Sequence, residues 1–256
     1  MRYAWEFYNE YMEREGGGKL KRTLIKYIMN YIRIWDKASA SRPDYYIANS
    51  KNVAKRIYKH YGIEADVIHP PVKGSYFNLS DIDEDYFLIV SRLVPYKKVD
   101  LAVEVFNELG LPLVVIGGGS QLEYLKSIAK PNVKIMGRQP DEVIKEQYAK
   151  CRAFIFPGEE DFGITPLEAQ ASGRPVIAYG KGGALETVVE GKTGLFFKEQ
   201  TKESLKNAIL RFNDMIWNKQ DIRDHALTFD EEIFKEKIRK YVEEKRNKMI
   251  NIGSVR

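Results

Sequence analysis

The sequence has little cysteine and histidine, and it has no long apolar run. Its 256 residues include one cysteine, Cys151, and three histidines. A single cysteine excludes a disulfide within the chain, and no Cys or His set has the spacing of a metal site. No stretch approaches the roughly 20 apolar residues that span a bilayer, and Glu6 and Glu10 interrupt any apolar run of a signal peptide. We therefore expect a cytoplasmic protein that depends on its core, with Cys151 as a small core residue.

Positive charge is concentrated in the first third of the chain. The formal net charge is +5; residues 1–80 hold 14 Lys and Arg against 8 Asp and Glu, so they contribute +6 and the remainder −1. A basic segment suits an acidic neighbour such as a phosphate-bearing lipid, a membrane surface or nucleic acid. A solvated helix face is the simpler interpretation, and both stay open at this point.

Residues 1–69 have the pattern helix, helix, strand, helix, strand. The glycines at 16–18 separate the first two helices. The second predicted helix, over 19–37, is basic, and apolar residues recur in it at helical spacing: Leu20, Leu24, Ile28, Ile32 and Trp35. We predict a short buried strand at 45–48, a helix over 51–61 capped by Asn49-Ser50, and a last strand at 67–68.

Residues 86–216 alternate apolar runs with helical patterns. The runs fall at 87–90, 113–116, 133–136, 153–156 and 175–178. The helical patterns fall at about 97–109, 120–129, 140–149, 164–172 and 201–215, and a final amphipathic helix covers about 230–247. Such alternation predicts an α/β fold with a parallel sheet and helices on both faces. Ligands bind such sheets at the carboxyl ends of the strands, where the strand order switches.

These patterns predict the domain organisation. We expect an incomplete first domain over 1–69, a linker over 70–85 that starts at Pro70-Pro71, a Rossmann-like domain over 86–226 and a C-terminal helix over 227–256. Two short strands do not make a stable doubly wound domain. The first region therefore resembles the end of a second Rossmann-like domain.

Three loops of the predicted sheet carry candidate chemistry. Gly117-Gly118-Gly119-Ser120 follows one strand and opens a helix, which suits either a phosphate or a plain tight turn. Arg92 and Lys97 follow the first strand, where two cations can stabilise a diphosphate leaving group.

The third loop is the stretch EDFGITPLEAQASG, over 160–173. Glu160 lies in the loop after a strand, and Glu168 lies about one turn into the next helix, so the two carboxylates can accept hydrogen bonds from one ligand's hydroxyls. Gly163 precedes this helix and permits backbone angles that other residues avoid.

Other chemistries fit the sequence poorly. Asp81, Asp83 and Asp85 resemble a metal-binding DxD pattern, but they precede a strand and no further ligand cluster supports them. We interpret His60 as a helix-end residue, His69 as part of the linker and His225 as a surface residue. A dinucleotide-dependent oxidoreductase is disfavoured, because the GxGxxG pattern with a later acidic residue is absent.

In these residues the chain resembles a family, the retaining group 1 glycosyltransferases of the GT-B type, and within it the mannosyltransferase-like branch. The resemblance covers nearly the whole chain and is most specific in the last of its motifs. These motifs are MRYAWEFY, DYYIANSKNVAKRI, VIHPPV, SRLVPYKKVDLAVEVF, VVIGGGSQLEYL, VKIMGRQ and EDFGITPLEAQASGRPVIAYGKGGALETVVEGKTG.

The resemblance implies roles for the candidate residues. Arg92 and Lys97 would hold the donor diphosphate, Glu160 would bind hydroxyls of the transferred sugar, and Glu168 would bind the ribose. Together with Arg92 and Lys97, Glu160 is a candidate catalytic residue. The other candidate donor-binding residues are Phe162, Gly163 and Ile164 beside the sugar, Gly118, and Gly137 and Arg138 (with Gln139) near the base.

The implied reaction moves a hexose, with mannose as the expected sugar, from a nucleotide sugar such as GDP-mannose to an acceptor that the sequence does not identify. The family implies retention of configuration, no metal and no other cofactor. We expect no nucleic-acid partner, and a peripheral contact of the basic helix with a membrane stays open beside simple packing of that helix.

Two departures from the family pattern matter. Lys98 stands where many members have glycine. Met1 matches an internal position of the N-terminal acceptor domain, and a functionally important histidine of this branch precedes the RYAW stretch. A donor-binding module that needs a second chain or the missing half is therefore the alternative to a complete transferase.

Overall fold

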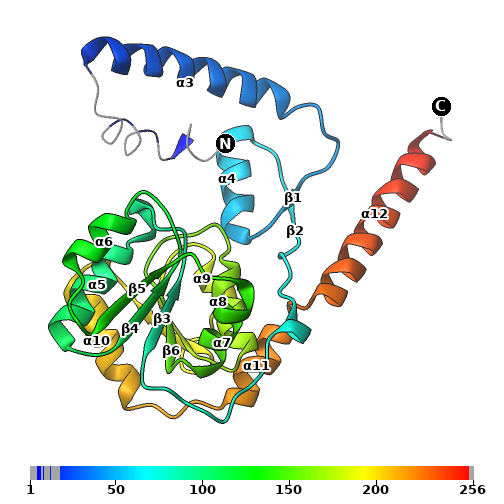
Figure 1. The fold of residues 1–256 in the computed structure, drawn as a ribbon. Helices are drawn as coiled ribbons and strands as arrows, with labels where there is room; N and C mark the ends of the chain where they lie inside the picture. The colour runs from blue at the N-terminus through cyan, green and yellow to red at the C-terminus, as the bar shows by residue number, and fades with distance from the viewer. Residues whose placement is uncertain (1–4, 7, 9–11, 13–17, 254–256) are drawn as a thin grey trace. The chain divides into compact units, whose positions relative to one another are not determined.

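A computed structural model describes residues 5, 6, 8, 12 and 18–253 of the chain. They form two compact units: the first comprises 1–48 and 54–66, and the second comprises 49–53 and 67–256. Figure 1 traces the elements of both units along the chain. None of the helices in these described ranges has both the length and the apolar character that crossing a bilayer requires.

The first unit contains one long helix and a small sheet. Helix α3 spans Lys19–Ser39, and strands β1 (Ile47–Ala48) and β2 (Asp66–Val67) form a two-stranded sheet. Helix α4, Lys51–Tyr61, lies between the strands in sequence; its residues 54–61 belong to the first unit and 51–53 to the second. Asp36 of α3 accepts hydrogen bonds from Trp5 Nε1 at 2.7 Å and from the Tyr61 hydroxyl at 2.5 Å. This carboxylate therefore connects α3 to the end of α4.

Several predictions for this unit are confirmed and one is partly wrong. Helix α4 has the predicted bounds, and the Ser50 hydroxyl caps it by accepting from the Val53 amide at 3.0 Å. The buried strand predicted over 45–48 shrinks to two residues, of which Ile47 is exposed and Ala48 is buried. The helix predicted before Gly16 lies mostly outside the described residues.

The predicted amphipathic helix forms, but four of the five apolar side chains predicted for its packing face are exposed, and only Ile32 is partly buried. Leu20, Leu24, Ile28 and Trp35 are 48–85% exposed, and Tyr27 and Tyr31 beside them are also exposed. The core-facing interpretation of this helix therefore fails for these side chains in the described part of the chain.

The second unit is the predicted alternation of strands and helices. Its elements are β3 (Phe87–Val90), α5 (Val99–Leu109), β4 (Leu113–Ile116), α6 (Leu122–Ile128), β5 (Val133–Gly137), α7 (Asp141–Lys150), β6 (Ala153–Phe156), α8 (Ile164–Ala171), β7 (Val176–Tyr179), α9 (Ala184–Thr187), β8 (Gly194–Phe197), α10 (Lys202–Asn213), α11 (Lys219–Leu227) and α12 (Glu231–Gly253). All the predicted strands and helices of this region are present. The sequence prediction missed β8, α9 and α11.

The sheet has six strands in the order β5-β4-β3-β6-β7-β8, and the paired strands are parallel. After β3 the chain builds outward through β4 and β5, and it then returns to place β6 on the other side of β3. The strand order thus reverses between β3 and β6. Parallel sheets of this kind bind ligands at the carboxyl ends of the strands beside such a switch point.

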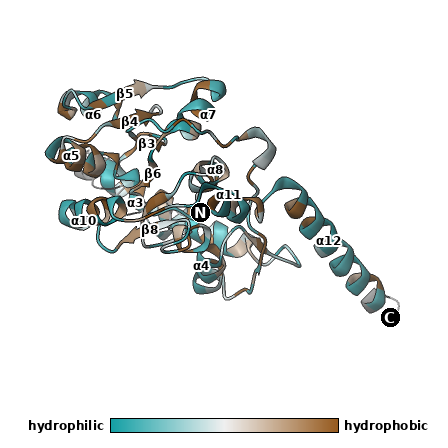
Figure 2. Cartoon of the chain, turned by 90° about the horizontal axis from the view of Figure 1, so that it is seen from below, coloured by the Kyte–Doolittle hydropathy of each residue, from teal (hydrophilic) through white to brown (hydrophobic). Residues whose placement is uncertain are grey.

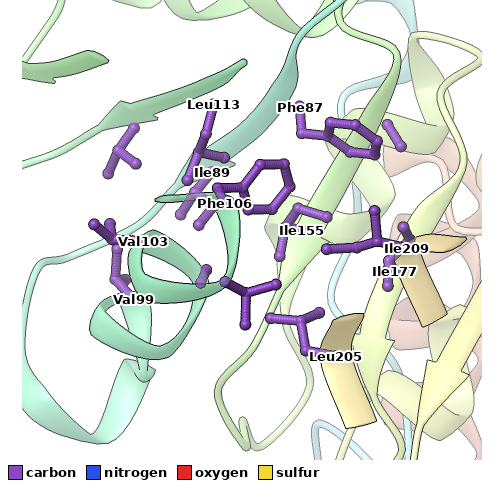
Figure 3. Close-up of a cluster of buried hydrophobic side chains, with 14 of the residues drawn as sticks. Phe87, Ile89, Val99, Val103, Phe106, Leu113, Ile155, Ile177, Leu205 and Ile209 are labelled. Atoms are coloured by element: carbon purple, nitrogen blue, oxygen red, sulfur yellow. The ribbon is translucent and has the colours of Figure 1, made fainter. Parts of the chain in front are cut away.

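Alternate residues of each strand enter two hydrophobic layers, as the two-residue period of a strand requires. Phe87 and Ile89 face the layer formed with α5, α6 and α10, where Phe106 and Ile209 are also buried (Figure 3). Leu88 and its counterparts face the other layer, formed with α7, α8 and α11. Figure 2 shows the apolar strands inside the unit and polar residues over the outer helices. The sheet is therefore buried on both faces, and its loops are left free to form a site.

Candidate functional site

Two loops leave the sheet on either side of the switch point. The loop after β3 contains Ser91, Arg92 and a 3₁₀ turn over Pro95–Lys97, and the loop after β6 runs from Pro157 to Gly163. Because β3 and β6 are parallel neighbours, both loops emerge at the same edge of the sheet. The predicted cations and the first predicted carboxylate thus lie on adjacent loops.

Lys97 and Glu160 meet across these loops. Lys97 Nζ forms an ion pair with Glu160 Oε1, and both side chains are only 17% exposed. Gly158 lets the backbones approach, because a Cβ there would fall 2.9 Å from the Lys97 Cα. Charges in partly dehydrated surroundings interact more strongly than exposed surface pairs. The structure therefore brings together one predicted cation and one predicted carboxylate at the switch point.

The Glu160 loop is fixed from behind by the loop after β7. Gly183 donates its amide to the Glu160 carbonyl at 2.8 Å. A Cβ on Gly183 would overlap the Phe162 backbone, and a Cβ on Gly182 would overlap the Glu160 carbonyl. The Gly-Gly of the sequence motif is thus required for close packing of two loops.

Glu168 is held on the first turns of α8 by a different partner. The Tyr148 hydroxyl, on a fully buried ring of α7, donates to Glu168 Oε2 at 2.9 Å. Burial raises the pKa of the Glu168 carboxyl, and the Tyr148 hydrogen bond lowers it in part. In the described part of the chain, Glu168 Oε1 has no hydrogen-bond partner, so this oxygen is open to a ligand. The sequence reasoning missed Tyr148: its helical spacing indicates burial, but nothing in the spacing identifies its partner.

The remaining cations of the site are unpaired. Arg92 is exposed and its side chain makes no hydrogen bond or ion pair with any described residue. Arg138 follows β5 and extends over Gly118, where a Cβ would fall 2.7 Å from the Arg138 Nε. Both guanidinium groups are therefore available to an anion.

The glycine run after β4 packs against the loop after β3. A Cβ on Gly117 would overlap the Ser91 carbonyl, and a Cβ on Gly119 would overlap the Leu93 carbonyl. The Leu93 amide donates to the Gly118 carbonyl at 3.0 Å, and the Gly117 amide donates to the Gly137 carbonyl at 2.8 Å. Close packing of the two loops thus explains why glycine stands at 117 and 119 without invoking a phosphate, which agrees with the tight-turn interpretation.

Phe162, Gly163 and Ile164 form the entry to α8. Gly163 has φ +86° and precedes the helix, which confirms the need for glycine there. Phe162 is 3% exposed, and its ring stacks on the His69 imidazole with centroids 5.2 Å apart. Ile164 is exposed. The backbone of this entry therefore lies at the same strand edge as Glu160.

His69 and Glu186 were not predicted to take part in this region. His69 Nε2 lies 2.9 Å from Glu186 Oε2, and the same carboxylate accepts from the amides of Lys51 at 2.8 Å and Asn52 at 3.1 Å. Within the second unit, Glu186 thus binds the amides of Lys51 and Asn52 and pairs with the His69 that stacks on Phe162. The interpretation of His69 as mere linker misses these contacts, which only the fold creates.

Three further interpretations can be compared with the structure. His225 is half-buried on α11 with Nε2 3.2 Å from the Thr187 carbonyl, so the surface assignment is wrong. Cys151 is fully buried, which raises the pKa of its thiol to about 12 and confirms its place in the core. His60 lies at the end of α4, as predicted. Within the described ranges, no group of His, Cys, Asp and Glu is arranged to hold a metal ion.

Comparison with known proteins identifies the family of the chain. The family model "Glycosyl transferases group 1" matches residues 77–221. The chain is 26% identical over 183 residues to an uncharacterized glycosyltransferase of Methanocaldococcus jannaschii, covering 70% of this chain and 52% of that protein. It is 32% identical over 145 residues to a GDP-mannose-dependent α-(1-6)-phosphatidylinositol monomannoside mannosyltransferase of Mycolicibacterium smegmatis, covering 50% of this chain and 38% of that protein. The chain thus spans about half the length, or less, of these relatives.

Solved structures agree on the fold. Sucrose-phosphate synthase of Thermosynechococcus elongatus superposes with a TM-score of 0.73 at 21% identity, over 83% of this chain and 61% of the other. The Anabaena protein HepE, in complex with UDP and glucose, superposes with a TM-score of 0.71 at 19% identity, over 83% and 66%. Both neighbours share the Rossmann-like architecture of GT-B glycosyltransferases. With more than half of its residues matched by the family model, this chain belongs to the group 1 glycosyltransferases.

Proposed function

We propose that the second unit binds a nucleotide sugar at the switch point and that the protein transfers a hexosyl group, a mannosyl group in our assignment, from that donor with retention. The observation that carries the proposal is the shielded Lys97–Glu160 pair between β3 and β6, with Arg92 unpaired on the same loop. A diphosphate supplies the negative charge that this cationic loop lacks. The mannosyl assignment is supported by the similarity to the mycobacterial GDP-mannose-dependent mannosyltransferase.

The residues divide the donor between them. Lys97 and Arg92 bind the diphosphate, Glu160 accepts hydrogen bonds from the sugar hydroxyls, and Glu168 Oε1 accepts from the ribose. The backbone of 162–164 borders the sugar, while Gly118, Gly137 and Arg138 border the nucleoside. The similar HepE structure holds UDP together with glucose, which supports a nucleotide and a sugar as the two halves of the ligand.

Transfer then requires stabilisation of the leaving group. The acceptor hydroxyl oxygen attacks the anomeric carbon from the face that the diphosphate leaves, the bond from that carbon to the diphosphate oxygen breaks, and the acceptor proton passes to the departing phosphate. Arg92 and Lys97 offset the charge that develops on this phosphate. No residue of this scheme needs a metal ion, and metal independence is part of the proposal.

Ligand-induced stabilisation tests the donor site directly. We expect GDP or UDP, or one of their sugars, to raise the unfolding temperature, because a ligand at 100 times its Kd stabilises by about 2.7 kcal/mol. Such a change corresponds to about 5–10 °C for a chain of this size. No shift with any of these nucleotides would refute the donor site.

Matched variants separate the site from a structural ion pair. Lys97→Met and Glu160→Gln should each weaken binding of the donor by about tenfold or more, because each removes a charged hydrogen-bonding group. Lys126→Met removes a cation of similar type from the exposed pair with Glu123 and should leave donor binding unchanged. Equal donor affinity in the site variants and the control would contradict the assignment.

A second candidate function is donor binding without transfer by this chain alone. The supporting observations are the two-stranded sheet of the first unit and the limited share of each relative's length that the chain covers. In this case the protein binds the nucleotide but does not transfer sugar until a further polypeptide is added. Product formation by the chain alone, with the anomeric configuration read by NMR, excludes this alternative and tests retention together.

Peripheral membrane contact is also a proposal for helix α3. The helix exposes Leu20, Leu24, Tyr27, Ile28 and Trp35, and its sequence holds several Lys and Arg residues with Asp36 as its one acidic residue. Apolar and aromatic groups with basic residues suit an anionic bilayer surface. Sedimentation with vesicles containing anionic lipid should pull down the protein at low salt, whereas neutral vesicles should not. Absence of binding to both would remove this proposal.

A further inference from the structure

A cavity opens at the other edge of the sheet, away from the donor loops. It has a volume of about 220 Å³, and Arg152, Arg174, Lys219, Asp83, Phe212 and Trp217 are among its lining residues. Arg152 immediately precedes β6, and Arg174 lies two residues before β7. Because the strands are parallel, their amino ends share one edge, opposite the edge that carries Lys97 and Glu160. The cavity is therefore separate from the proposed donor site.

The cavity carries more positive than negative charge. Three of its lining side chains are cationic and one, Asp83, is a carboxylate. Asp83 is shared by two of the cations, since it pairs with Arg174 and accepts from Lys219 Nζ at 2.7 Å. Burial works against ionisation of Asp83, but the hydrogen bonds from Lys219 and Arg174 lower the pKa of its carboxyl. Asp83 is therefore occupied by Arg174 and Lys219, and it does not neutralise the third cation of the lining.

Arg152 is that third cation. Its guanidinium lies over the Phe87 and Phe212 rings, with its central carbon 5.6 and 5.9 Å from their centroids. Its ion pair with Asp85 is 3.0 Å long, but Asp85 is 76% exposed, so the pair is a weak competitor for a ligand. Arg152 is positioned by the aromatic rings and remains able to bind an anion.

Two buried donors of the lining have no acceptor. Arg174 is 3% exposed and its Nε, like the Nε1 of Trp217, is buried without any hydrogen-bond partner among the described residues. A buried donor that is left unpaired destabilises the folded protein. Both unpaired groups are N–H donors. They belong to residues that line the cavity, so an acceptor that reaches them from the cavity would satisfy them.

We propose that this cavity is a binding site for a small oxyanion of the phosphate type, held by Arg174 Nε, Trp217 Nε1, Arg152 and Lys219. A volume of about 220 Å³ lies below the roughly 300–1,000 Å³ of pockets for larger organic ligands, yet it is several times the share of one water. The unprotonated oxygens of hydrogen phosphate accept hydrogen bonds and match a fork of N–H donors. Its source is either free phosphate or the phosphate group of a small metabolite.

Trp217 reports on this cavity directly. The three tryptophans are Trp5, Trp35 and Trp217, and the first two belong to the other unit. We expect titration with inorganic phosphate, against chloride at matched ionic strength, to give a saturable change in tryptophan fluorescence and a higher unfolding temperature. A parallel titration with a hexose monophosphate distinguishes the two sources: tighter binding than phosphate assigns the site to the metabolite, and equal or weaker binding assigns it to the free ion.

Two rim variants and two controls complete the test. Arg152→Gln and Lys219→Met should each weaken phosphate binding by about tenfold, since each removes a charged donor. Trp217→Phe keeps an aromatic ring in place of the indole that stacks on Phe212, at 5.4 Å and 16°, and should abolish the fluorescence change. Lys97→Met, at the donor loops, should leave this response intact. Lack of a saturable response, an equal response to chloride, or a response lost in Lys97→Met but kept in both rim variants would overturn the proposal.

Discussion

The hydrogen bond from Tyr148 to Glu168 offers a sharp test of how the site is built. Tyr148→Phe removes one oxygen and keeps the ring, which packs edge-on against Phe77 at 5.8 Å and lies 5.6 Å from Phe154. The core contacts of α7 are therefore preserved. The change isolates the 2.9 Å hydrogen bond to the Glu168 carboxylate.

The size of the effect depends on the charge of Glu168. A hydrogen bond to an ionised group contributes about 1.5–3 kcal/mol, and one between neutral groups about 1 kcal/mol. Burial raises the pKa of Glu168 above its ordinary value of 4.5, and the Tyr148 hydrogen bond limits that rise. The folded protein thus holds the proton more tightly than the unfolded chain does.

The raised pKa of Glu168 determines how the stability of the protein depends on pH. Stability contributed by Glu168 is full below the unfolded pKa and is lost as the pH rises through the folded pKa, because the unfolded chain ionises first. Tyr148→Phe raises the folded pKa further, so the loss continues to higher pH. We expect the variant to be less stable than the wild type by about 1 kcal/mol near pH 4 and by about 2–3 kcal/mol near pH 8.

Urea unfolding followed by circular dichroism measures this difference. Tyr86→Phe is the matched control: the Tyr86 hydroxyl donates to the Gln147 carbonyl at 2.9 Å, on the same helix, but its acceptor does not titrate. Its destabilisation should be about 1 kcal/mol at both pH values. A destabilisation of Tyr148→Phe that is equally small at both pH values would refute the reasoning, since it would mean that Glu168 is not an ionised acceptor of this bond.

Three further outcomes are expected. Lys98→Gly should stabilise the protein by about 0.5–1 kcal/mol in urea unfolding, because Lys98 has φ +54° and relief of the left-handed strain exceeds the added freedom of the unfolded chain; a destabilised variant would show that the Lys98 side chain stabilises the turn. Gly183→Ala should destabilise the protein by about 1–3 kcal/mol and weaken nucleotide binding, because the new Cβ overlaps the Phe162 backbone. Gly110→Ala is the control for backbone strain alone, since Gly110 has φ +69° and nothing within 4 Å of an added Cβ. It should destabilise by about 1 kcal/mol and leave nucleotide binding unchanged. Asp83→Asn should lower the free energy of unfolding by about 1 kcal/mol at pH 7, a value kept small by the exposure of Asp83. Because the pKa of Asp83 is lowered in the folded protein, its stabilising contribution is present above the ordinary value of 3.8 and is lost as the pH falls through the folded pKa. An equal loss of stability at pH 2–3 and pH 7 would contradict the ion pairs as its cause.

The alternation of apolar runs and helical patterns was sufficient to predict most of the second unit. Four-residue runs such as 87–90 and 153–156 became strands with unchanged bounds. Strand β8 was missed because Gly194–Phe197 begins on a glycine directly after a turn, which leaves a run of three apolar residues, and α11 was missed because its sequence KQDIRDHAL is mostly polar. Such elements are defined by what they pack against, which a single sequence does not contain.

The positions of the site residues could be predicted from local patterns, but their contacts could not. Position along the chain placed Arg92, Lys97 and Glu160 after strands, and parallel pairing then brought their loops to one edge. The partners of these residues were not predictable: Tyr148 meets Glu168 across two helices, and Glu186 meets His69 over 117 positions of sequence. Local periodicity carries no information about such distant contacts.

The backbone conformation of Lys98 offers a physical reason why glycine would be favoured at this position. The resemblance implies glycine at this position in many members of the family, and among the described residues Lys98 alone has a positive φ without being glycine. The 3₁₀ turn over Pro95–Lys97 ends there, and α5 begins at the next residue. The backbone turns left-handed at this point, one residue after the Lys97 that pairs with Glu160. A glycine preference at this position is therefore a consequence of the turn and not of ligand contact.

The same logic explains why the donor edge is rich in glycine. Gly117 and Gly119 let the loop after β4 lie on the backbone of the loop after β3, and Gly182 and Gly183 let the loop after β7 lie on that of the loop after β6. Each contact joins backbone to backbone, so the loops that carry Arg92, Lys97 and Glu160 are fixed before any ligand arrives. Charged groups held in place by the fold need little rearrangement when a diphosphate binds or leaves. The glycines thus affect donor binding through the rigidity of the neighbouring loops. Substitutions at Gly119 or Gly183 should alter donor binding although the added side chain would meet a loop of the protein and not the ligand.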